Sequence, residues 1–86
     1  MTKLTEMFNI GKELEKKLQS VDIDSAEKLA EVGSKEAFLR LKEVYPNVCL
    51  VHLYALEGAI TDTEFNSLPE ETKRDLKAFC DKTKRL

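Results

Sequence analysis

The residues best placed for chemistry lie in a short glycine turn near the start of the chain. Asn9, Ile10 and Gly11 separate two segments of helical pattern, so they have the form of a helix-hairpin-helix turn. Asn and Gly both tolerate positive φ, and unpaired N–H groups at the start of the next helix can bind a phosphate. Lys12 and Lys16 lie one helical turn apart and would add two cations. The candidate nucleic-acid-binding residues are therefore Asn9, Gly11, Lys12 and Lys16.

The charges around this turn argue against strong DNA binding. Glu13 and Glu15 are interleaved with the lysines, and residues 3–17 hold four lysines against three glutamates. A strong binder of the DNA backbone has a clearer basic face. The sequence therefore favours a purely structural hairpin, with weak, sequence-independent DNA contact as the alternative.

Cys49 and His52 are three residues apart on one helical segment, a spacing at which two metal ligands would face the same way. No second such pair exists, and the remaining cysteine, Cys80, is far away in the sequence. The pair is no better suited to act as a thiol nucleophile and its general base than as metal ligands, because an apolar environment disfavours the thiolate. We expect no metal, no cofactor and no catalytic residue, but two free thiols with Cys49 in the core.

Glu57 lies within the most apolar segment, three residues after Tyr54 and next to Gly58, whose missing side chain lets a neighbouring helix come close. A buried carboxylate must be paired or hydrogen-bonded. We expect Glu57 and Tyr54 to be structural polar residues of the core, with Glu57 capping the N–H groups of another helix. A catalytic carboxylate would need a partner in a pocket, and the sequence supplies none.

The last part of the chain carries a local basic surplus. Residues 73–86 hold six basic and two acidic residues, with Lys82, Lys84 and Arg85 at the end. The usual structure of such a segment is a solvated helix end, which complements the helix dipole. Contact with an acidic partner or a phosphate is the alternative.

The element that must position these residues is the segment from Cys49 to Ile60, which is apolar apart from His52, Glu57 and Gly58. A helix that is apolar on every side is buried on every side, and this one is too short to cross a bilayer. We therefore predict a central helix at about residues 48–61, capped by Asn47.

Helical periodicity also dominates the rest of the chain, with Gly33 and Pro46 as stop signals. Ala30 is expected on an inner face and Phe65 as the anchor of its loop. The expected N-caps are Asp24 or Ser25, then Ser34 and Ser67. The fold class is thus all-α, a compact helix-hairpin-helix-like bundle of about five to six short helices in a single domain, residues 1–86. Besides the central helix, the predicted helices span about residues 5–8, 12–20, 24–31, 34–45 and 68–82.

Composition is that of an ordinary soluble domain, with 42% apolar and 35% charged residues and a net charge of −2. This charge gives no general attraction to nucleic acid or to an anionic membrane. No apolar run follows a basic start, so we expect no signal peptide and a cytoplasmic location.

Several segments together resemble the C-terminal domain of the TfoX (Sxy) competence regulators. They are residues 8–11, Val32-Gly33, residues 36–41, the run Tyr-Ala-Leu-Glu-Gly-Ala at 54–59, and residues 66–71. The resemblance implies an all-helical domain without catalytic activity, found in bacterial regulators that promote expression of DNA-uptake genes. The sequence holds no N-terminal TfoX domain, so we expect a free-standing version of the C-terminal part. Phe65 stands where the family often has tryptophan, and His52 where it usually has an aliphatic residue.

These observations favour a non-enzymatic regulatory or interaction module that contacts a protein partner or associates with itself. Weak DNA-backbone binding through the glycine turn is the alternative, and no small-molecule substrate is expected.

Overall fold

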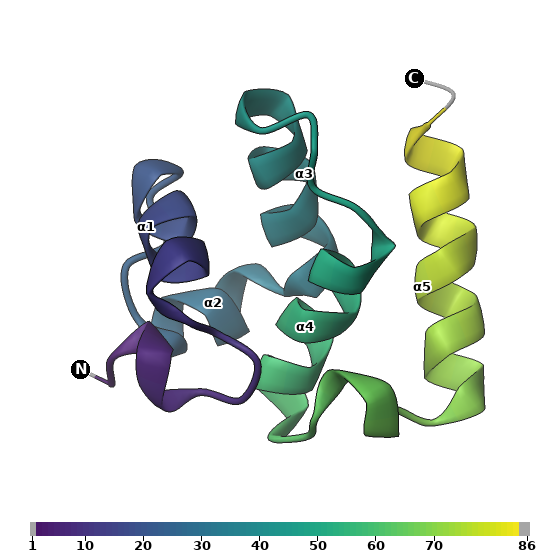
Figure 1. Cartoon of the computed structure of the whole chain (residues 1–86), viewed down its shortest axis with the longest axis horizontal. Coiled ribbons are helices and arrows are strands. Elements are labelled where there is room, and N and C mark those ends of the chain that lie inside the picture. Colours follow the sequence, from purple (N-terminus) through teal and green to yellow (C-terminus); the bar gives the residue numbers. More distant parts are fainter. Residues whose placement is uncertain (1, 85–86) are drawn as a thin grey trace.

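Five α-helices and two 3-10 turns make up the regular structure of residues 2–84, the part of the chain that the computed structural model describes (Figure 1). This confirms the all-α fold, and the second 3-10 turn is the element that the sequence did not predict. The elements in order are η1 (Leu4–Glu6), α1 (Lys12–Ser20), α2 (Ala26–Val32), α3 (Ser34–Val44), α4 (Leu50–Thr61), η2 (Phe65–Ser67) and α5 (Glu70–Thr83).

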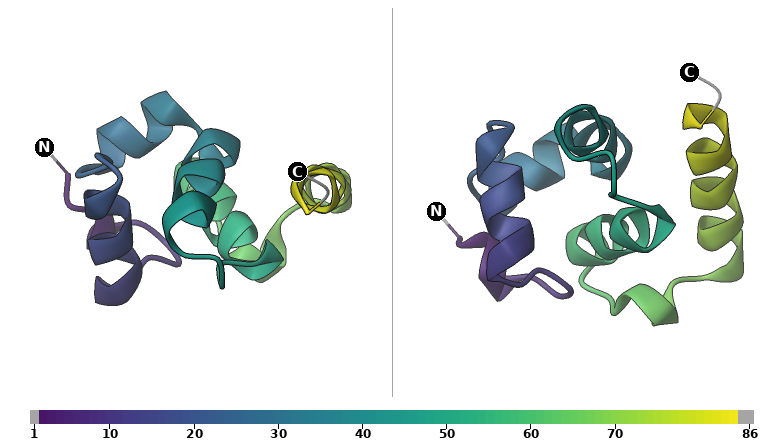
Figure 2. Two further views of the ribbon diagram at one scale, coloured as in Figure 1. Left: turned by 90° about the horizontal axis from the view of Figure 1, so that it is seen from above. Right: turned by 45° about the horizontal axis from the view of Figure 1, so that its top comes forward.

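Helix α4 is the centre of the fold and packs against α2, α3, α5 and η2. Figures 1 and 2 show α1 and α5 on opposite sides of it. Leu53 and Leu56 of α4 are fully buried. They contact a core to which every other α-helix contributes apolar side chains, among them Leu18, Leu29, Phe38, Leu41 and Leu76. The central helix of the sequence prediction is therefore present.

Burial of α4 is not complete, which corrects the prediction that it is covered on every side. Val51 is 54% exposed. Cys49 is exposed too, so it is not a core residue. The helix begins at Leu50, and its N-cap is Cys49 rather than Asn47. The reason is a reciprocal capping box: the Cys49 sulfur accepts from the N–H of His52, and His52 Nδ1 accepts from the N–H of Cys49 at 3.1 Å.

Small residues determine where α2 begins and where it ends. Ser25 caps α2 as predicted, because its Oγ accepts from the Lys28 N–H at 3.1 Å. Gly33 ends α2 with φ of 90°, a conformation that favours glycine. Gly33 is also the N-cap of α3, so Ser34 is the first residue of that helix and not its cap.

Three other local predictions were wrong. Ala30 is exposed, since the seven residues of α2 bury only Leu29 fully. Phe65 is 40% exposed and begins η2 instead of anchoring its loop in the core. Because η2 includes Ser67, the N-cap of α5 falls at Pro69.

Replacing Leu53 with alanine should lower the free energy of unfolding by about 2–5 kcal/mol, because it leaves a cavity in the core. The matched control is Val51→Ala on the same helix, which should change stability by no more than about 0.5 kcal/mol because the side chain is largely exposed. Urea denaturation measures both. Equal midpoints for the two variants would contradict the central position of α4.

Candidate functional site

The side chain of Asn9 is committed to internal hydrogen bonds. Its Nδ2 donates to the carbonyl oxygens of Thr63, at 3.0 Å, and Ala55, at 3.3 Å. Its Oδ1 accepts from the N–H of Phe65 at 3.1 Å. The residue is half-buried and has φ of 70°. Asn9 therefore fastens the loop before α1 to the end of α4, and its amide does not face a ligand.

Gly58 permits this close approach. A Cβ at this position would clash with the Thr63 carbonyl oxygen and with Asn9 Nδ2. Thr63 in turn donates its N–H to the Gly58 carbonyl at 2.8 Å, closing a turn in which Asp62 is left-handed with φ of 59°. The sequence predicted that Gly58 makes room for a helix, but it makes room for two loops.

Gly11 does not have the backbone conformation that the turn prediction gave it. Its φ of −92° and ψ of −178° are extended, and a Cβ there would meet nothing within 4 Å. The positive φ of the turn belongs to Asn9 instead. Gly11 is the N-cap of α1 and is exposed, as are Lys12 and Lys16. The turn thus presents three of the four candidate residues to solvent and encloses the fourth.

Beside this turn lies a groove between α1 and α4, which we call the α1–α4 groove. Its volume is about 400 Å³. Val51 and Phe65, both exposed, line it together with the half-buried Leu14. Its other lining residues are Asn9, Gly11, Glu13, Lys17, His52 and Ala55. The sequence did not reveal this apolar surface, because Val51 belongs to a helix expected to be covered. The polar His52 beside it was the available clue.

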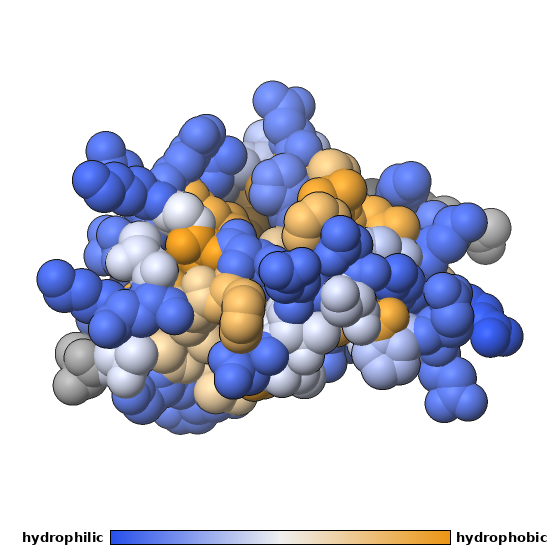
Figure 3. All heavy atoms as spheres, turned by 60° about the horizontal axis from the view of Figure 1, so that its bottom comes forward, coloured by the Kyte–Doolittle hydropathy of each residue, from blue (hydrophilic) through white to orange (hydrophobic). Residues whose placement is uncertain are grey.

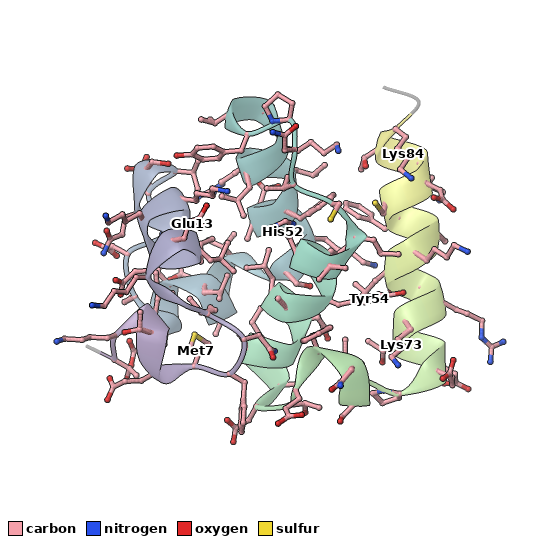
Figure 4. All side chains as sticks on the ribbon, viewed as in Figure 1. Met7, Glu13, His52, Tyr54, Lys73 and Lys84 are labelled. Atoms are coloured by element: carbon pink, nitrogen blue, oxygen red, sulfur yellow. The ribbon has the colours of Figure 1, made fainter. Side chains whose placement is uncertain are left out.

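His52 stands at the edge of the groove, between α1 and the start of α4 (Figure 4). Partial burial lowers the pKa of its imidazole from the ordinary 6.5, and the positive charge of Lys17 lowers it further. Glu13 and the hydrogen bond with Cys49 act in the opposite direction. The Cys49 sulfur lies 3.5 Å from His52 Nδ1. The pair serves as a helix cap. In the described part of the chain, no group of three or more His, Cys, Asp or Glu side chains could hold a metal ion.

Glu57 and Tyr54 are both half-buried and make separate hydrogen bonds. Glu57 Oε1 accepts from the hydroxyl of Ser34 at 2.6 Å, so it contacts the first residue of α3 rather than a free N–H. The Tyr54 hydroxyl donates to the Lys73 carbonyl oxygen at 3.3 Å, and its side chain points to α5 (Figure 4). The two residues therefore tie α4 to two different helices.

The basic end of α5 is exposed at Lys77, Lys82 and Lys84. Lys84 Nζ lies 3.8 Å from a carboxylate oxygen of Asp81, while Arg85 lies outside the described residues. Within residues 2–84, no helix combines the length and the apolar character that crossing a membrane requires.

Comparison with known proteins matches residues 1–80 to the family described as the TfoX C-terminal domain. No curated protein matches the chain. Two crystal structures from Listeria monocytogenes have the same fold. An uncharacterized protein in a triclinic form is 44% identical, with a TM-score of 0.93 over 94% of this chain and 92% of that one. A protein of unknown function in a tetragonal form is 45% identical, with a TM-score of 0.90 over 93% and 98%.

The two glycines near the turn should respond to alanine to different degrees. Gly58→Ala should destabilise the protein by about 1–3 kcal/mol, because its methyl group would overpack against backbone and the Asn9 amide. Gly11→Ala should change stability by less than about 1 kcal/mol, because the extended conformation suits alanine and the unfolded chain loses freedom, while alanine is a poorer N-cap than glycine. Thermal melts of both variants test this. A lower melting temperature for Gly11→Ala than for Gly58→Ala would contradict the assigned roles.

His52 should make stability fall on acidification. Its folded pKa is lower than the unfolded value of 6.5, so the unfolded chain binds the proton more readily as the pH drops below 6.5. His52→Gln keeps an acceptor for the capping box but does not titrate. Between about pH 7.5 and about pH 5.5, the melting temperature of the parent should therefore fall further than that of His52→Gln. Parallel curves would show that His52 does not contribute.

Proposed function

The chain belongs to the TfoX C-terminal domain family, and from this premise we propose that it is a non-enzymatic regulatory module that binds a partner protein through the α1–α4 groove. The observation that carries the proposal is the pair of exposed apolar side chains in one groove, Val51 at 54% and Phe65 at 40% exposure. Contiguous apolar surface with a polar rim is typical of sites that contact other proteins. Covering it with a partner contributes roughly 25 cal/mol for each Å² of apolar area removed from water.

The composition of the groove favours a protein over a phosphate. Leu14, Val51 and Ala55 give it an apolar wall from two helices. On its rim Lys17 lies 3.7 Å from Glu13, so that cation has a carboxylate next to it. A phosphate chain gains nothing from apolar contact, whereas an amphipathic helix or a strand places apolar side chains in such a groove.

The side chains whose types could serve in catalysis have structural roles instead. Cys49 and His52 cap α4, and Glu57 bonds to Ser34. This supports the non-enzymatic part of the proposal. The two free thiols, Cys49 and Cys80, suit a reducing compartment, so the proposed location is the cytoplasm.

Weak DNA-backbone binding is the second candidate, and the exposure of Gly11, Lys12 and Lys16 at the open start of α1 favours it. Against it, Asn9 is engaged internally, and Glu13 and Glu15 lie in the same first turn. Such binding would depend on phosphate charge and would weaken steeply with salt.

Val51→Glu should remove partner binding, because it places a charge in the apolar wall of the groove. Val44→Glu is the matched control: Val44 is 56% exposed and does not line the groove. Tagged protein and both variants would be used to retain partners from a lysate of the source cells, and sedimentation would measure self-association. We expect Val51→Glu to retain at least about tenfold less partner protein than Val44→Glu retains.

The proposal fails if the parent neither retains a protein nor self-associates, or if both variants behave alike. A shift assay with duplex DNA separates the second candidate. Retardation at low salt with a log–log slope near −0.9 per phosphate, lost on replacing Lys12 and Lys16 with glutamine, would favour DNA binding instead.

A further inference from the structure

A second groove lies on the other side of α4, where the start of α3 and the face of α5 meet it. We call it the α3–α5 groove. Its volume is about 790 Å³, larger than the α1–α4 groove, and the two have no lining residue in common. Neither the family match nor the proposed function assigns a role to it.

The floor of the α3–α5 groove is apolar. Leu39, Ile60 and Phe79 are half-buried there, one from each of the helices α3, α4 and α5, and Leu76 lies buried between them. Half-buried side chains from three helices form a surface that a ligand can cover further. Apolar residues of a partner segment would remove this surface from water.

The rim is acidic. Glu36 at the start of α3, Glu57 of α4, and Glu71 and Asp75 of α5 all line the groove. Among the described lining residues the cation is Lys35, and its Nζ lies 2.8 Å from Asp75 and 5.4 Å from the centre of the Phe79 ring. The lysine is therefore already held by the groove itself. Glu36 is paired with Arg40, whose Nε lies 3.1 Å from its carboxylate, so the negative surplus comes from Glu57 and Glu71.

We propose that the α3–α5 groove binds a basic amphipathic segment of a partner protein, with its apolar residues on the floor and its Lys or Arg residues against the rim. Charge complementarity selects this occupant, because a negative rim attracts cationic side chains and repels phosphate or acidic segments. An apolar floor between helices favours a helix with apolar residues at i, i+3, i+4 and i+7.

The probe is a fluorescent 14-residue helical peptide that has leucines at that spacing and lysines elsewhere, measured by anisotropy. Two control peptides accompany it: one with glutamate in place of every lysine, and one with the same composition but no apolar face. We expect the first peptide to bind and the glutamate peptide not to bind. The peptide without an apolar face should bind at least about tenfold more weakly than the first.

Two variants of lining residues and one control variant locate the binding in the groove. Glu71→Lys should weaken it about tenfold, whereas Glu70→Lys, the adjacent exposed residue that does not line the groove, should change it less than about twofold. Ile60→Thr should weaken binding about threefold or more, because it removes apolar floor while keeping a β-branched shape. Thermal melts confirm that each variant is folded.

The proposal is overturned if the parent protein does not bind the peptide. It is also overturned if Glu70→Lys and Glu71→Lys lose equal affinity for the peptide, because the peptide would then be attracted by the overall charge of the protein. Equal binding of the glutamate peptide overturns the charge argument. If the parent protein self-associates and Glu71→Lys abolishes this self-association, the groove binds a second copy of the chain, and the proposal of a different partner protein is overturned. Val51→Glu should leave peptide binding unchanged, so failure here and failure of the proposed function are distinguishable.

Discussion

The structure depends on one constraint: α4 has no continuous polar face, so water must be excluded from most of its surface. Leu53 and Leu56 meet this requirement completely, at zero exposure. In a chain of 86 residues the neighbours available for covering such a helix are short. Three α-helices and a 3-10 turn pack against α4, and nearly all of the buried apolar side chains belong to one cluster. A single core of this size leaves little reserve stability.

Polar contacts fix where those neighbours lie against α4. Apolar burial is not directional, but hydrogen bonds are, and three sets of them leave α4 for different parts of the chain. Glu57 reaches the start of α3, Tyr54 reaches the backbone of α5, and the carbonyl of Ala55 accepts from Asn9. The Asn9 contact is possible only because residue 58 is glycine. Position 9 therefore combines a left-handed backbone with three hydrogen bonds, which explains why an asparagine is suited to it.

The sequence predicted the elements well because their signals are local. The helix Lys12–Ser20 has the predicted bounds, and the stops at Gly33 and Pro46 follow from the backbone chemistry of glycine and proline. It predicted the site less well because the site depends on contacts between distant segments. Asn9 lies 54 residues from Thr63 in the sequence, and no sequence pattern near either residue predicts their hydrogen bond. For the same reason the exposure of Val51 and Cys49 was missed, since periodicity tells which side chains are apolar but not how far neighbours extend along a helix.

Incomplete covering of α4 is what gives this small domain its surfaces. Val51 and Phe65 remain in contact with solvent in the α1–α4 groove, and Ile60 and Phe79 remain partly exposed in the α3–α5 groove. Apolar and hydrophilic surfaces alternate in patches on the face drawn in Figure 3. Because the two grooves use opposite sides of α4 and share no lining residue, an occupant of one groove would leave the other groove open. The helix that organises the core is thus also the common wall of both grooves, so the packing that stabilises the fold also determines the shape of the surfaces that it presents.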